Sequence, residues 1–213
     1  MKVRLVPTIL VPNFLEFEKR VKFLEKYFYL VQIDCADGRF VGNKTFYEVN
    51  KVNEVVGVNF ELHLMVEYPL IEINKWLNNK RLKGVIFHYE AVDDSGGILN
   101  IINYLHKKKI KVGLAINPNT KVEKINEFLP YLDELLVLGV KPGWGGRKFL
   151  PSSLQKIRKL RKLNKKINIG VDGGVNLQNA RKIIKSGANV LYVGHFLSNI
   201  NNIKAFKTLI KNF

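Results

Sequence analysis

Two hydrophobic patterns alternate along this chain of 213 residues. Short apolar runs, which are typical of buried strands, alternate with stretches in which apolar residues recur every three or four positions, as in amphipathic helices. The strand-like runs are Val3–Thr8, Leu30–Asp34, Phe60–Met65, Gly84–His88, Lys111–Ile116, Leu135–Val140, Ile167–Asp172 and Val190–Val193. The pattern therefore predicts eight strands separated by helices.

The first helical stretch has the clearest periodicity. Asn13 and Glu16 are placed as a capping box at its start, and its apolar residues are Phe14, Phe17, Val21, Leu24 and Phe28. Gly187 is placed as a helix C-cap. The later helical stretches are Leu70–Leu77, Ile98–Lys108, Val122–Leu129, Ser152–Lys165, Leu177–Ser186 and Ile203–Ile210, with a weaker one near Phe46–Val52.

Eight strands alternating with helices in a chain of this length predict one α/β domain, a (β/α)8 TIM barrel over residues 1–213. A doubly wound open sheet is the structural alternative. No G-x-G-x-x-G motif follows the first strand, so nothing supports dinucleotide binding there.

The chain is strongly basic, with 35 Lys and Arg against 18 Asp and Glu and a net charge of +17. This charge could indicate an anionic partner, either nucleic acid or a phosphorylated small molecule. Lysines are spread along the whole chain, however, and the densest run, Lys156–Lys166, keeps its leucines at helical spacing. We therefore favour a compositional origin of the charge over nucleic-acid binding.

Other bulk properties predict a cytoplasmic protein. Cys35 is the one cysteine, so no internal disulfide can form, and we expect it to pack in the core. No apolar run is long enough to span a membrane, and the opening MKVRLVPTIL lacks the features of a signal peptide.

In a parallel barrel, side chains at the carboxyl ends of the strands converge on one face. Asp34 ends the second strand and would share a side with Gln32, although it could instead be a turn residue before Asp37-Gly38. The residues predicted to converge are Thr8, Gln32, Asp34, His63, Met65, His88, Asn117, Asp172, Gly194 and His195.

Glycine-rich turns follow the last three strands and could hold a phosphate through backbone N–H groups. They comprise Gly143, Gly145, Gly146, Gly173, Gly174 and Gly194, with Arg147 and His195 nearby as additional charge. The histidines allow two interpretations: His63 is either a metal ligand or a hydrogen-bonded core residue, and His88 is interpreted as a barrel-interior residue without an assigned partner. Trp144 either covers a ligand or packs its own loop.

Several blocks together resemble the ribulose-phosphate 3-epimerase family. They are PTIL at 7–10, DCADGRFV at 34–41, HLMV at 63–66, NP at 117–118, PGWGG at 142–146 and VDGGV at 171–175. The resemblance implies a (β/α)8 barrel of the pentose phosphate pathway that interconverts D-ribulose 5-phosphate and D-xylulose 5-phosphate. It also implies a homo-oligomer.

The resemblance further implies that Asp34 and Asp172 act as acid and base, and that Asp34, His63 and Asp172 bind a divalent metal, whether Zn, Fe(II), Mn or Co. Proton removal on one face of a carbon and return on the other suits two carboxylates, and a metal would stabilise the enediolate. The implied substrate and phosphate residues are Thr8, His63, Gly143, Gly145, Gly146, Gly173, Gly174, Gly194 and His195.

Departures from the family pattern keep alternatives open. Gln32 replaces the usual fourth histidine ligand, Ala36 a methionine and Thr8 a serine; Gly139, Lys141, Arg147 and His195 also differ. A neutral amide oxygen is a weaker ligand, so the doubtful member of the metal set is Gln32. The alternatives are an epimerase of another ketose phosphate, or a non-catalytic phosphosugar-binding barrel with a degraded metal site.

Overall fold

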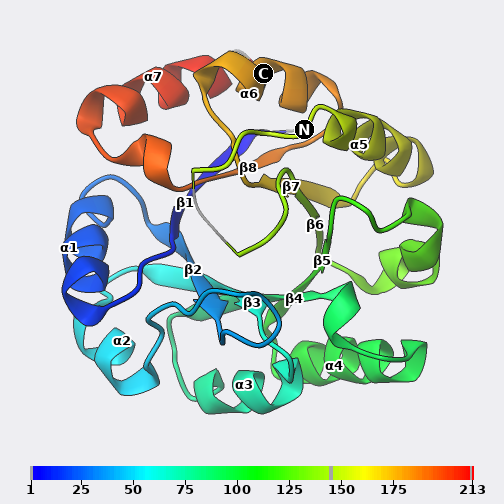
Figure 1. The fold of residues 1–213 in the computed structure, drawn as a ribbon, viewed down its shortest axis with the longest axis horizontal. Coiled ribbons are helices and arrows are strands. Elements are labelled where there is room, and N and C mark those ends of the chain that lie inside the picture. Colours follow the sequence, from blue (N-terminus) through cyan, green and yellow to red (C-terminus); the bar gives the residue numbers. More distant parts are fainter. Residues whose placement is uncertain (1, 144–145, 212) are drawn as a thin grey trace.

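The computed structural model describes residues 2–143, 146–211 and 213, and its strands form a closed parallel barrel in the order β1 to β8. The strands are β1 (Arg4–Ile9), β2 (Leu30–Ala36), β3 (Asn59–Met65), β4 (Leu82–His88), β5 (Lys111–Ile116), β6 (Glu134–Leu138), β7 (Asn168–Asp172) and β8 (Val190–Val193). Figure 1 shows the helices as an outer ring around this barrel. The predicted (β/α)8 fold is confirmed.

The helices pack their apolar faces against the outside of the barrel. The α-helices of the described chain are α1 (Phe14–Leu24), α2 (Val49–Val55), α3 (Pro69–Trp76), α4 (Ser95–Lys107), α5 (Ser152–Leu163), α6 (Leu177–Lys185) and α7 (Ile200–Ile210), and short 3-10 turns are η1 (Tyr89–Ala91) and η3 (His195–Leu197). Asn13 caps α1 through the Glu16 N–H, and Gly187 has a left-handed φ of 114° after α6, both as predicted. Among the described residues, no helix is long and apolar enough to cross a bilayer.

Between β5 and β6 the α-helix predicted over Val122–Leu129 is wrong in type, because the chain forms the 3-10 helix η2 (Val122–Tyr131). The buried residues Val122, Ile125 and Phe128 are spaced by three, which places them on one face of a helix with three residues per turn. The predicted end of the sixth strand at Val140 is also wrong. The strand ends at Leu138. The Gly139 N–H makes the last bond to β7, donating to the Asp172 carbonyl at 2.6 Å, and the Gly139 carbonyl accepts the Leu150 N–H of the following loop at 2.7 Å.

The barrel interior near the amino ends of the strands holds a buried polar network. The Tyr192 hydroxyl lies 2.5 Å from a Glu61 carboxyl oxygen and 2.7 Å from one of Glu134, and Arg4 donates to Glu134 at 2.7 Å. A phenol has one proton to donate, so one of the two glutamates must itself carry a proton to complete both bonds. Burial raises the pKa of Glu61, and burial together with the Glu61 charge raises the pKa of Glu134 to about 7.

Strand register sets the opposite, carboxyl end of the barrel. Asp34 pairs in register with His63, and Asp172 with Tyr192. Because alternate side chains point inward, Gln32 and Asp34 face the interior, whereas Cys35 packs with Ile33 in the layer between barrel and helices. The carboxyl ends therefore present a group of polar side chains to one cavity.

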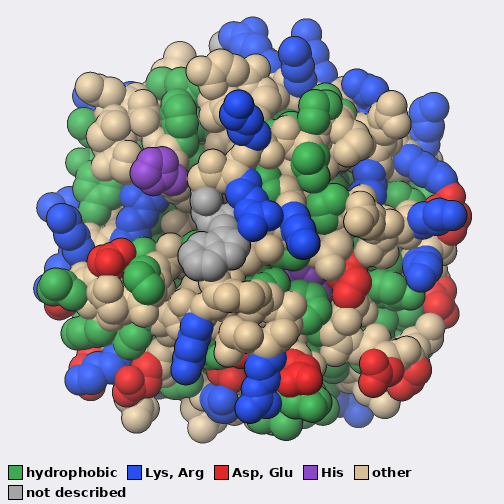
Figure 2. Space-filling model, in the orientation of Figure 1, with side chains coloured by type: hydrophobic (Ala, Val, Ile, Leu, Met, Phe, Trp, Pro, Cys, Tyr) green, Lys and Arg blue, Asp and Glu red, His purple; other side chains and the backbone are tan. Residues whose placement is uncertain are grey.

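The positive charge is spread over the surface. Figure 2 shows Lys and Arg side chains scattered over this face, with Asp and Glu among them mainly in its lower half. The basic helix α5 buries Ile157 and Leu160 and keeps most of its cations outside. This distribution supports the compositional interpretation of the charge.

Candidate active site

A cavity of about 730 Å³ opens at the carboxyl ends of the strands. Its lining includes the predicted residues Thr8, Asp34, His63, Met65, Gly143, Gly146, Arg147, Asp172, Gly173, Gly174, Gly194 and His195. The predicted residues Gln32, His88 and Asn117 are not in this lining. Trp144 and Gly145 lie outside the described residues.

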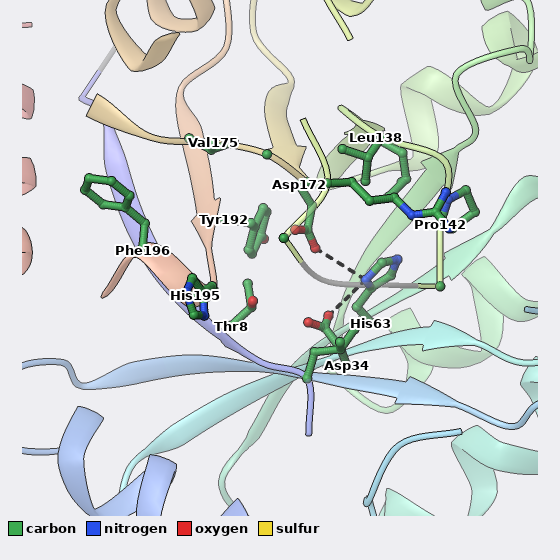
Figure 3. Close-up of a pocket in the computed structure, with 18 of the residues that line it drawn as sticks. Thr8, Asp34, His63, Leu138, Pro142, Asp172, Val175, Tyr192, His195 and Phe196 are labelled. Carbon is green, nitrogen blue, oxygen red and sulfur yellow. Dashed lines mark hydrogen bonds and ion pairs between the residues drawn. The ribbon is translucent and has the colours of Figure 1, made fainter. Parts of the chain in front are cut away.

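The polar centre of the cavity consists of Asp34, His63 and Asp172, whose side chains point toward one another in Figure 3. His63 Nδ1 lies 3.0 Å from Asp34 Oδ1 and 3.5 Å from Asp172 Oδ2. One ligand atom from each residue lies within 4.8 Å of the other two. The turn interpretation of Asp34 is thus wrong, because its carboxylate faces the interior and the neighbouring Asp37 accepts the N–H groups of the turn.

The charges of this centre shift its proton affinities. Burial and repulsion by Asp172 raise the pKa of Asp34 to about 6, against the opposing effect of His63. Burial alone would lower the pKa of His63, but its hydrogen bonds and attraction to Asp172 and Asp34 raise it to about 9. The centre therefore favours positive charge at the point where the three side chains meet.

Gln32 is the fourth side chain at this centre. Its Nε2 donates to Asp34 Oδ1 and to Asp172 Oδ2, both at 2.8 Å. Its Oε1 is buried and has no hydrogen-bond partner within the described part of the chain. Two carboxylates and an imidazole suit a divalent transition metal, so the three-residue set fits such an ion. Gln32 fits as a fourth ligand only after its amide turns, because an amide nitrogen does not coordinate.

The turn after β7 forms the other end of the cavity. Gly173 and Gly174 have φ values of 100° and 69°, which only glycine adopts without strain, and a Cβ on Gly174 would lie 2.5 Å from the Phe149 nitrogen. The helix α6 begins directly after this turn, capped by Asn176. Thr8 and His195 lie across the cavity from His63 in Figure 3. This end combines a glycine turn that lines the cavity with a helix N-terminus, an arrangement that suits an anion.

Sequence reasoning missed Arg20 of α1, which lines the cavity. Its guanidinium donates to the carbonyl oxygens of Gly194 at 2.8 Å and Leu197 at 2.9 Å. Burial lowers the pKa of Arg20 to about 10. A signal was present, because Arg20 follows Phe17 by three residues and thus interrupts the buried face of α1.

The fold and the centre together define the class of protein: a (β/α)8 enzyme whose paired carboxylates and histidine sit at the carboxyl ends of its strands. The family model "Ribulose-phosphate 3 epimerase family" matches residues 4–197. The chain belongs to the ribulose-phosphate 3-epimerase family, and it is accordingly an enzyme of the isomerase class.

Individual relatives agree with this assignment. The chain is 34% identical over 201 residues to the ribulose-phosphate 3-epimerase of Schizosaccharomyces pombe, covering 91% of this chain and 86% of the relative. It is 30% identical over 200 residues to that of Bacillus subtilis, covering 90% of each. A tryptophan synthase structure from Pyrococcus furiosus shares the fold alone, with a TM-score of 0.67, 13% identity, and coverage of 99% of this chain and 96% of that one.

Proposed function

We propose that this enzyme interconverts D-ribulose 5-phosphate and D-xylulose 5-phosphate by moving a proton at C3. The observation that carries the proposal is the pair Asp34 and Asp172, two carboxylates from strands β2 and β7 that meet at one histidine. The phosphate would lie on Gly173, Gly174 and Gly194, beside Thr8 and His195. The pathway implied by the family name is the pentose phosphate pathway.

In this mechanism one carboxylate removes the C3 proton from one face and the other acid returns a proton to the opposite face. Asp34, with a pKa raised to about 6, can hold or release a proton near neutral pH. Asp34, His63 and Asp172 would hold a divalent metal. When bound, the ion supplies positive charge that stabilises the enediolate. His63 lies between the two carboxylates, with Nδ1 near one oxygen of each, and so fixes their relative orientation.

The test is Asp172→Asn, with the exposed Asp93→Asn as the matched control. Losing one of two proton-transfer groups should lower kcat for epimerisation by about 10²- to 10⁴-fold, and the control should be unchanged. In D₂O the variant should still exchange the C3 hydrogen of one epimer through Asp34 without inverting it. Unchanged turnover in Asp172→Asn, or equal loss of exchange from both epimers in a folded variant, would contradict the two-carboxylate mechanism.

A different ketose phosphate is the second candidate substrate, because Arg147 and His195 make the cavity lining more basic than the usual family pattern does. Comparing kcat/KM on ketose phosphates of different chain length decides between the two. We further propose a homo-oligomer in the cytoplasm. The buried free thiol of Cys35 is compatible with a reducing compartment.

A further inference from the structure

Behind the metal-ligand set lies a chain of hydrogen bonds that leads away from the cavity. Nδ1 of His63 faces the two aspartates, and Nε2 of His63 lies 3.0 Å from Nε2 of His88. The second nitrogen of His88, Nδ1, lies 3.3 Å from Glu90 Oε2. His88 is a buried interior residue, as predicted, and the partners that the sequence left unassigned are His63 and Glu90.

The far end of this chain is fixed. Glu90 Oε1 accepts the Asn117 backbone N–H at 2.9 Å and also the Thr120 hydroxyl. These bonds, with the one from His88, outweigh burial and lower the pKa of Glu90, so this carboxylate accepts on both oxygens. A ring of Phe40 covers His88 at 4.8 Å between ring centroids, and the His88 ring is fully buried.

The ionised carboxylate of Glu90 determines which nitrogen of each histidine carries the proton of each hydrogen bond. Glu90 can only accept, so His88 must carry its proton on Nδ1. The His88 ring is fully buried, which disfavours its charged form, so its second nitrogen, Nε2, is left as an acceptor. The 3.0 Å contact then requires a proton on Nε2 of His63. With Nε2 holding that proton, Nδ1 is the nitrogen that faces Asp34 and Asp172, and it becomes able to bind a metal when its own proton is released.

We propose that Glu90 and His88 are positioning residues that hold His63 in the one tautomer able to offer Nδ1 to a divalent metal. They touch neither metal nor substrate. Residues that orient a ligand histidine through its second nitrogen commonly change metal affinity about 10- to 100-fold when they are altered. The inference rests on the proposed function only in placing a metal at Asp34, His63 and Asp172.

Glu90→Gln tests the proposal, because the substitution is nearly isosteric and reverses the donor and acceptor roles along the chain of hydrogen bonds. The Asn117 N–H requires an oxygen, so the new amide must turn its NH₂ toward His88. His88 would then accept at Nδ1 and donate from Nε2, and His63 would carry its proton on Nδ1, where the metal binds. The matched control is Thr120→Val, which removes one hydrogen bond to Glu90 and leaves its acceptor toward His88 intact.

Two measurements separate this role from a merely structural one. ¹⁵N NMR of the metal-free protein should place the His88 proton on Nδ1 in the wild type and in Thr120→Val, and on Nε2 in Glu90→Gln. Competition between the protein and a chelator for Zn²⁺, without substrate, should show a Zn²⁺ affinity about 10- to 100-fold lower in Glu90→Gln and unchanged in Thr120→Val. An unchanged His88 tautomer, or equal Zn²⁺ affinity in the three proteins, would overturn the proposal.

If Glu90→Gln does not fold, His88 provides the second pair of variants. His88→Leu removes the acceptor for His63 Nε2 and should lower Zn²⁺ affinity, and His88→Gln, whose oxygen can still accept, should lower it less. Equal affinities in both would also contradict the proposal. None of these readouts uses the epimerase reaction, so a failure of the proposed substrate leaves them interpretable.

Discussion

The shared proton of Glu61 and Glu134 predicts an unusual pH dependence of stability. Replacing Glu134 by Gln keeps the shape of the side chain and removes one of the two carboxyls that meet at Tyr192. With one carboxyl left, the Tyr192 hydroxyl can donate to Glu61 and no shared proton is required. Glu61→Gln should act in the same way, because the proton belongs to the pair.

The sign and size follow from the pKa of Glu134, which rises from its ordinary value of 4.5 to about 7. Between these values the folded state holds a proton that the unfolded chain has released, so the free energy of unfolding falls as pH rises. One pKa unit corresponds to about 1.4 kcal/mol, so the loss approaches about 3 kcal/mol at pH 7 and above. Below pH 4.5 this contribution is complete.

Urea denaturation at intervals from pH 4.5 to 8.5 measures the effect. We expect the wild type to lose about 3 kcal/mol relative to either glutamine variant across this range, since other titrating groups cancel in the difference. Parallel stability curves for the wild type and both variants would refute the shared proton.

Two further predictions concern the backbone. Gly174→Ala and Gly146→Ala both place a side chain at a left-handed φ. Among the described residues, the new Cβ meets an obstacle at Gly174, the Phe149 nitrogen at 2.5 Å, and none at Gly146. Thermal unfolding should therefore show Gly174→Ala to be about 1–3 kcal/mol less stable than Gly146→Ala, and equal losses would contradict this. Asp94 caps α4 by accepting the Gly97 N–H at 2.8 Å, so Asp94→Ala should cost about 1 kcal/mol in denaturant unfolding and Asp94→Asn almost nothing, whereas equal costs would show that the cap is not what stabilises the helix.

The barrel was predictable from sequence because each buried strand is a short apolar run and each helix has its own periodicity. The segment Val122–Tyr131 was misassigned because residues spaced by three also suit one face of an α-helix over two turns. The end of the sixth strand was misplaced because Val140 continues the apolar run. The ladder ends because the Gly139 carbonyl accepts the Leu150 N–H of the following loop instead of an N–H of β7.

The candidate site was predictable where it depended on strand ends, as for Asp34, His63 and Asp172. Partners that come from other elements could not be read in the same way. Glu90 reaches His88 from the following turn and is itself fixed by the loop after β5, so the link to His63 appears only in three dimensions. The orientation of the Gln32 amide likewise depends on two strands that are far apart in sequence.

Tyr192 has a consequence for how this enzyme can change. In (β/α)8 barrels the carboxyl end of the strands commonly carries function and the amino end stability, so the two can be altered separately. Here the same tyrosine lines the cavity and closes the network of Glu61 and Glu134. Substitutions at the amino end that are selected for thermal tolerance would therefore also change the cavity wall at Tyr192. Stability and activity would then evolve together in this chain.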